Sequence, residues 1–181
     1  MAVVGQNGAE DRVLIGESYV GTGAEAAHVN TVLGSRSGVV GAAWTTSLAT
    51  PSTGHVPFIA VLAPGIPVKP LTLFVTKAAA ASEQHANITW GAAQAGVAGG
   101  VADAVAAGVI SAAEAESLLL IVAVWVDPKA ADADLVYANN RAATQAALAA
   151  GLSGEPSLDK VLAAAAAPAN PFYTSPPARR A

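Results

Sequence analysis

Short apolar segments bounded by glycines predict the first strands of this chain. Residues 12–20 and 27–33 each suit a strand, and Gly21-Thr22-Gly23 between them suits a tight turn. This turn lacks the third glycine of a dinucleotide-binding loop, and a strand follows it instead of a helix, so it does not indicate phosphate binding. Because alternate residues of a strand share a face, His28 and Asn30 are expected to project from the same side, about 7 Å apart.

The remaining pattern mixes strands and helices without strict alternation. Further strands are expected at 58–63, 71–76 and 118–126, and helices at 35–49, 129–150 and 157–167, with a short capped helix starting at Ser111-Ala112-Ala113-Glu114. Residues 82–107 are rich in alanine, but four glycines make one unbroken helix doubtful. The pattern favours an α+β fold, a two-layer sandwich with helices packed on one face of a β-sheet.

Proline and glycine positions suggest where the folded unit begins and ends. We expect an N-terminal extension at 1–11, one globular domain at 12–167 and a proline-rich tail at 168–181 that is extended or frayed. The first residues lack the basic and apolar regions of a signal peptide, and the longest apolar run, 118–126, is about half a membrane span. A cytoplasmic protein without a membrane partner is therefore expected.

Composition narrows the classes of partner. The chain is 53% hydrophobic and 12% charged, with a formal net charge of -4. Its few basic residues form no stripe that could neutralise a nucleic acid, so none is expected as a partner. So little polar surface favours burial between subunits, which predicts a homo-oligomer.

Histidine is the residue type best suited to moving protons here. The chain has no cysteine and only three histidines, His28, His55 and His85. They form no metal-binding motif, so no metal site is expected. His28 is placed where it could act on a small ligand together with Asn30. A hydrogen-bonded structural histidine at a strand start is the alternative interpretation.

One long segment and several shorter ones resemble a known family. The longest is Ile15-Gly16-Glu17-Ser18-Tyr19-Val20-Gly21-Thr22-Gly23-Ala24-Glu25-Ala26-Ala27-His28-Val29-Asn30. Others are Ala60-Val61-Leu62-Ala63-Pro64, Gly91-Ala92-Ala93-Gln94-Ala95-Gly96-Val97-Ala98 and Asn170-Pro171-Phe172. In this order and spacing they resemble the formaldehyde-activating enzyme family, from about Leu14 to Phe172.

The resemblance implies both a fold and a reaction. Members have an α+β fold similar to ribosomal protein S5 domain 2 and form homopentamers. They are lyases of one-carbon metabolism and formaldehyde detoxification that condense formaldehyde with tetrahydromethanopterin, giving the methylene derivative and water. The implied activity is thus that of a hydro-lyase, with a reduced pterin as co-substrate and no covalently bound cofactor.

The resemblance also implies site residues. His28 matches the proposed proton donor, and the pterin-binding positions correspond to Asn30, Ile59, Lys77, Ala79 and Gln94. The family usually has Asp, Thr and His where this chain has Asn30, Ala79 and Ala95. Losing a carboxylate and a hydroxyl changes the expected affinity for a pterin. The alternatives are a non-catalytic homologue that binds or senses a pterin or formaldehyde, and an oligomeric scaffold without a ligand.

Overall fold

The computed structural model describes residues 12–176, which form a five-stranded sheet in the order β1-β2-β7-β6-β3. The strands are β1 (Leu14–Val20), β2 (Ala27–Ser35), β7 (Leu118–Trp125), β6 (Leu71–Thr76) and β3 (Pro57–Ile59). Neighbouring strands are antiparallel except β6 and β7, which are parallel. A short 3-10 helix, η1 (Gly23–Glu25), follows the predicted turn between β1 and β2. The predicted N-terminal extension at 1–11 lies outside the described residues.

The strand expected at 58–63 is divided into two. β3 belongs to the main sheet, whereas β4 (Val61–Ala63) pairs with β5 (Ile66–Pro67) in a separate two-stranded sheet. Fully buried Ala60 lies at the division, where its N–H donates to the Thr72 carbonyl and its carbonyl accepts from the Val68 N–H. The chain therefore turns out of the sheet without leaving the Ala60 backbone unpaired.

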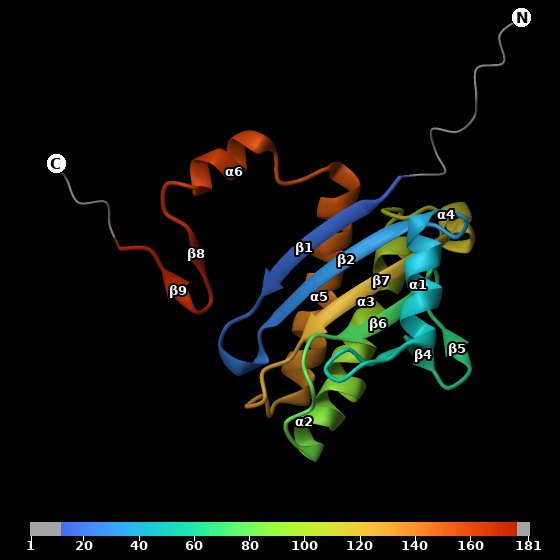
Figure 1. Ribbon diagram of the computed structural model, residues 1–181, viewed down its shortest axis with the longest axis horizontal. Coiled ribbons are helices and arrows are strands. Elements are labelled where there is room, and N and C mark those ends of the chain that lie inside the picture. Colours follow the sequence, from blue (N-terminus) through green and yellow to red (C-terminus); the bar gives the residue numbers. More distant parts are fainter. Residues whose placement is uncertain (1–11, 177–181) are drawn as a thin grey trace, which may run out of the picture.

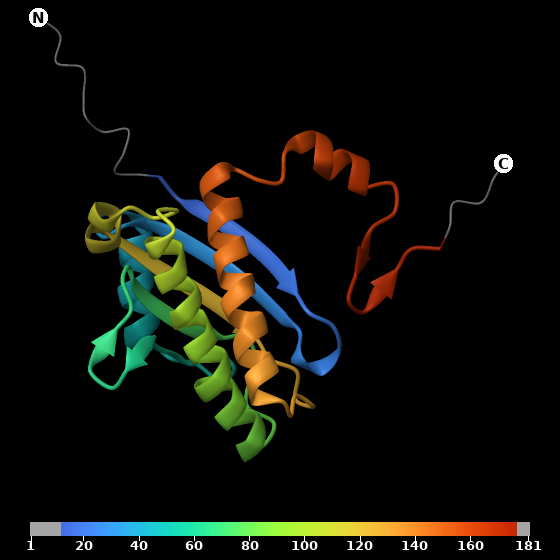
Figure 2. The same cartoon turned by 180° about the vertical axis from the view of Figure 1, so that it is seen from behind.

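Two long helices cover one face of the sheet, which confirms the expected α+β sandwich. α3 (Gln94–Ala106) and α5 (Ala133–Ser153) run side by side across the sheet and lie in front of the strands in the view of Figure 2. α5 begins later than predicted because the Asp132 side chain accepts the Leu135 N–H as an N-cap. It also continues past Gly151 and ends at Gly154, where φ is 72°.

The segment with four glycines is helical throughout. α2 (Glu83–Asn87) continues through a π-helical turn, η2 (Ile88–Ala93), directly into α3. The doubt about one helix was wrong because glycine here permits close packing: a Cβ at Gly96 or Gly100 would lie 2.5 Å from a carbonyl oxygen of α5. The Arg141 guanidinium also pairs with Asp103 across these helices, with Nη2 2.7 Å from Oδ1, and this lowers the pKa of Asp103.

A third helix lies on the opposite face of the sheet. α1 (Val39–Ala49) places Val40 and Trp44 on Leu73 and Leu119, and it lies in front of the strands in Figure 1. The sequence predicted helices on one face of the sheet only, whereas the structure places α1 on the other face. Its cover is partial, because it spans only one end of the strands.

The remaining elements lie at the edges. α4 (Ala112–Ser117) carries the predicted capping box, in which Ser111 and Glu114 exchange hydrogen bonds. After α5, α6 (Leu158–Ala164) leads into a hairpin of β8 (Ala169–Asn170) and β9 (Tyr173–Thr174), which stands away from the body in Figure 1. Among residues 12–176, no helix is both long and apolar enough to cross a membrane.

Candidate functional site

The sheet face opposite α3 and α5 carries its side chains in rows across the strands. Strand register places Tyr19, His28 and Trp125 in one row, Glu17, Asn30 and Ala123 in the next, and Val32, Ile121 and Leu73 in a third. The third row is apolar and belongs to the cluster beneath α1. The other two rows contain most of the polar side chains, and together they form the candidate site.

His28 lies on this face in contact with a carboxylate. Its Nε2 is 3.0 Å from Oε1 of Glu17, and the two side chains are 41% and 61% exposed. The contact is an ion pair when the imidazole is protonated. The sequence reasoning did not select Glu17, although the period of β1 puts residues 15, 17 and 19 on one face beside β2. A check for cross-strand partners of His28 and Asn30 could have found it.

Lys77, at the end of β6, contacts the same set of polar side chains. Its Nζ donates a hydrogen bond to Oδ1 of Asn30, which is the register partner of Glu17. Burial lowers the pKa of Lys77, and the negative charge of Glu17 partly opposes this shift. Three predicted residues, His28, Asn30 and Lys77, are thus brought together from β2 and β6.

A cavity of about 760 Å³ lies over these residues. Glu17, Tyr19, His28 and Asn30 line it from the sheet, and Ala169, Asn170 and Pro171 line it from the C-terminal hairpin. This volume is within the range of pockets that bind drug-sized molecules, about 300–1,000 Å³. The segment predicted to be an extended or frayed tail therefore includes a hairpin that forms one wall of the site.

Ile59 and Gln94 lie apart from His28, Asn30 and Lys77 in the folded chain. Ile59 is the register partner of Leu73 and packs in the cluster beneath α1. Gln94 belongs to the helical layer, is 7% exposed, and donates from Nε2 to the Val61 carbonyl at 3.0 Å. Gln94 has an evident structural role in this position, since its hydrogen bond ties α3 to β4.

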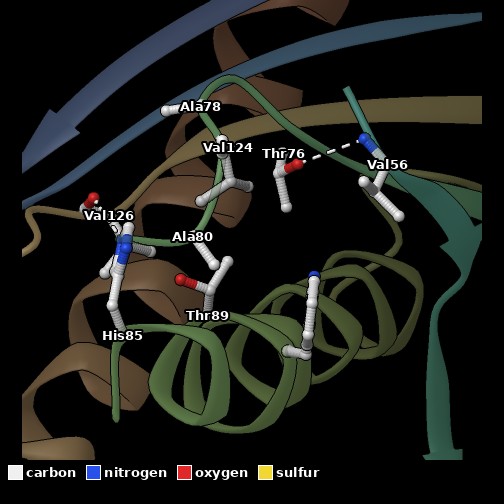
Figure 3. A pocket seen from close by; sticks show the side chains of 10 residues that line it. Val56, Thr76, Ala78, Ala80, His85, Thr89, Val124 and Val126 are labelled. Carbon is white, nitrogen blue, oxygen red and sulfur yellow. Dashed lines mark hydrogen bonds between the residues drawn. The ribbon is translucent and has the colours of Figure 1, made fainter. Parts of the chain in front are cut away.

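Ala79 lines a different and smaller cavity of about 20 Å³, enough for one water molecule. Figure 3 shows this cavity between the end of β6 and the helix below it, with Thr76 accepting the Val56 N–H. Across the cavity lies Thr89, in the π-helical turn, whose buried hydroxyl has no hydrogen-bond partner among residues 12–176.

His85, on the wall of the same cavity, is fixed by two hydrogen bonds. Its Nδ1 accepts the Ala81 N–H at 3.0 Å, so the proton of the neutral ring lies on Nε2, which is 3.0 Å from the Val126 carbonyl. The side chain is 4% exposed. This histidine holds the loop after β6 against the end of β7, which suits a structural role.

The titratable side chains near His28 do not suggest a metal centre. Within residues 12–176, no three histidine, aspartate or glutamate side chains converge to hold an ion. His28 and Glu17 alone are fewer than the three protein ligands of a typical catalytic zinc site. The chemistry that this group can perform is proton transfer and the orientation of a polar ligand.

Comparison with known proteins identifies the family. The family model described as "Formaldehyde-activating enzyme (Fae)" matches residues 15–173. A Methanosarcina barkeri protein named 5,6,7,8-tetrahydromethanopterin hydro-lyase is 41% identical over 159 residues, covering 88% of this chain and 89% of that relative. A Methanothrix thermoacetophila protein named "Bifunctional enzyme Fae/Hps" is also 41% identical, but the matched region covers 82% of this chain and only 38% of that protein. The chain therefore belongs to the formaldehyde-activating enzyme family.

Proposed function

We propose that this protein condenses formaldehyde with tetrahydromethanopterin or a related reduced pterin, forming a methylene adduct and water. The observation that carries the proposal is the convergence of His28, Asn30 and Lys77 on one sheet face, with His28 and Asn30 lining a cavity of suitable size. The relative named 5,6,7,8-tetrahydromethanopterin hydro-lyase supports the choice of reaction. The pterin is a co-substrate in this proposal, and no resident cofactor is required.

His28 acts as the general acid. A ring nitrogen of the pterin adds to the formaldehyde carbon, which forms the first C–N bond and a carbinolamine. Hydroxide is a poor leaving group, so the imidazolium gives its proton to the carbinolamine oxygen as the C–O bond breaks and water departs. The arylamine nitrogen of the co-substrate's side chain then attacks the iminium carbon and releases a proton, which restores the acid. Glu17, 3.0 Å from Nε2, orients the ring throughout.

Lys77 and Asn30 bind and orient the co-substrate. The Lys77 ammonium is a donor held in place by the Asn30 carbonyl, so both groups present a fixed arrangement to a polar ligand. An amide at position 30 contributes one hydrogen-bond acceptor and one donor group, whereas a carboxylate would contribute acceptors and a charge. A reduced pterin suits either arrangement because its ring edge has both donors and acceptors.

The proposal includes a homo-oligomer, a pentamer by family resemblance, acting in the cytoplasm. Ile59, Ala79 and Gln94 match pterin-binding positions but lie apart from His28 within one protomer. Exposed apolar side chains, among them Ile15 at 67% and Val39 at 62%, also favour contact with further copies. A neighbouring copy would bring a second set of these residues to the site.

The decisive experiment compares enzymatic with spontaneous condensation. Wild type, His28→Ala and His28→Gln are mixed with formaldehyde and tetrahydromethanopterin, and methylene product is followed against a protein-free control. Wild type should exceed the spontaneous rate, and both variants should lose about 10²–10⁴-fold of the enzymatic rate. The pterin dissociation constant, measured separately, should change little.

Two results would contradict the proposal in different ways. If wild type binds the pterin without accelerating condensation, the protein is a binding or sensing homologue, the function that the substitutions at Asn30 and Ala79 favour. If both His28 variants retain the wild-type rate, His28 is not the acid. Repeating the assay with tetrahydrofolate tests whether another reduced pterin is the preferred co-substrate.

A further inference from the structure

We propose that the C-terminal hairpin is a working part of the reaction site, in which Phe172 anchors on Trp125 so that Asn170 and Pro171 form a roof over His28. This inference rests on the proposed function and adds positioning residues to it. Asn170 and Pro171 line the same cavity as His28, although they follow it by more than 140 positions in the sequence. The sheet supplies the floor of this cavity and the hairpin supplies its cover.

The hairpin has its own fixed shape and an aromatic anchor on the body. The Phe172 N–H donates to Oδ1 of Asn170 at 2.9 Å, and the Ser175 N–H donates to the Pro168 carbonyl at 3.3 Å. The Phe172 ring meets Trp125 edge-on, with centroids 5.8 Å apart and planes at 85°, which is a favourable arrangement for aromatic rings. The turn is therefore internally braced, and this aromatic pair is its contact with the end of β7, a light contact because Phe172 remains 79% exposed.

The position of the anchor links it to the acid. Trp125 is the register partner of His28 on the adjacent strand, and Tyr19 is its partner on the other side. The Phe172 ring therefore docks in the row that contains His28. Because Oδ1 of Asn170 is engaged within the turn, its NH₂ group is the part that can donate to a molecule in the cavity.

The proposed chemistry explains why a roof is needed. With the hairpin in this position, the side chains of His28 and Glu17 are still 41% and 61% exposed, so the roof covers the acid only in part and a bound co-substrate must complete the closure. Loss of water from a carbinolamine is reversible, and excluding bulk water protects the iminium from rehydration. The anchor must also release to admit substrate. An aromatic pair biases a closed position by only about two- to tenfold, which suits reversible closure.

Chemical labelling tests the roof without any assay of the reaction. Diethylpyrocarbonate modification of His28 is followed by mass spectrometry, with exposed His55 as the internal standard. Phe172→Ala should raise the His28-to-His55 labelling ratio by up to about twofold, because the His28 side chain is already 41% exposed with the hairpin in place. The matched control Leu162→Ala removes an exposed apolar residue of α6, 62% exposed, and should leave the ratio unchanged. An unchanged ratio in Phe172→Ala would overturn the proposal, and so would an equal rise in both variants.

Ligand-dependent protection then tests whether the roof serves the substrate. Tetrahydromethanopterin should slow amide exchange at 169–174 in wild type and less so in Phe172→Ala, while Phe172→Tyr restores the protection. In turnover, Phe172→Ala should raise KM for the pterin more than it lowers kcat. If the pterin binds without protecting the hairpin, the inference fails while the proposed function stands. If the pterin does not bind at all, the proposed function fails, and the labelling ratio still decides whether the hairpin covers His28.

Discussion

The two faces of the central sheet use the same strands for different purposes. Toward α3 and α5, β2, β6 and β7 present alanine, valine, leucine, phenylalanine and threonine, and several of these side chains are fully buried. Toward the cavity, the alternate positions of β1 and β2 include Glu17, His28 and Asn30, which are half-buried or exposed. Strand periodicity therefore separates the groups that stabilise the fold from those that are available for chemistry.

This separation predicts different consequences for mutations on the two faces. Burial of apolar area on the helical face stabilises the fold, by about 25 cal/mol per Å². On the cavity face, the ammonium of Lys77 is partly desolvated, which disfavours its charged form. Substitutions on the helical face should mainly lower the stability of the fold, and substitutions on the cavity face should mainly lower activity.

The largest expected effect on stability lies on the helical face. Leu148→Ala removes a side chain of α5 that is 2% exposed and should lower the free energy of unfolding by about 2–5 kcal/mol. Urea unfolding measures this, with Leu158→Ala, at a site 71% exposed, as a control expected within about 0.5 kcal/mol of wild type. His28→Ala should also remain within that limit. A large loss of stability in His28→Ala would contradict the proposed difference between the two faces.

The next effect concerns the charge at position 30. Asn30→Asp restores the carboxylate that is usual in the family and places it against Lys77. A hydrogen bond from the pterin to this carboxylate would be charge-assisted, whereas one to the amide is neutral, so Asn30→Asp should tighten pterin binding by about tenfold or more. The new counter-charge should also raise the lowered pKa of Lys77. Isothermal titration calorimetry measures the affinity, and weaker binding than wild type would show that Asn30 is adapted to a different ligand.

A smaller effect is expected at the unpartnered hydroxyl of Thr89. Thr89→Val removes a buried oxygen without a protein partner and should raise the free energy of unfolding by about 1 kcal/mol. Thr144→Val is the matched control, because its hydroxyl donates to the Asn140 carbonyl at 2.8 Å and its loss should be destabilising. Equal destabilisation of both variants would indicate that the Thr89 hydroxyl is satisfied by a bound water.

The smallest effect is a pH dependence that comes from Lys77. Its folded pKa is below its ordinary value of 10.5, so the unfolded chain binds the proton more tightly. The free energy of unfolding of wild type should therefore increase as pH rises from the lowered pKa toward 10.5, and Lys77→Met should lack this increase. For a half-exposed group the difference should be below about 1 kcal/mol. Thermal melts between pH 7 and 10, with exposed Lys129→Met as control, test the sign.

The sequence predicted most elements because their signals are local. Apolar β-branched runs marked β6 and β7, and the Ser111 capping box marked the start of α4. It failed where distant packing decides the outcome. The glycines of α3 are tolerated only because α5 passes closely beside them, and the strand at 58–63 divides because Ala60 bonds to Thr72 and Val68.

The candidate site shows the same division between local and distant information. Period two placed His28 and Asn30 on one face, and the family resemblance selected Lys77, which indeed contacts Asn30. Neither could reveal Glu17 beside His28 or the hairpin over the cavity, because both depend on strand register and on a chain segment far along the sequence. Nor could they show that Gln94 is engaged with Val61.

By itself the sequence determined the family, the α+β class and the residue types available for proton transfer, since these depend on motifs and on the period of each element. The tertiary structure alone decided which polar groups meet: Glu17 with His28, Lys77 with Asn30, and Phe172 with Trp125. The physical reason is that a catalytic arrangement depends on distances between side chains of a few ångströms. Sheet register and chain packing set those distances, and neither is encoded in any short stretch of the chain.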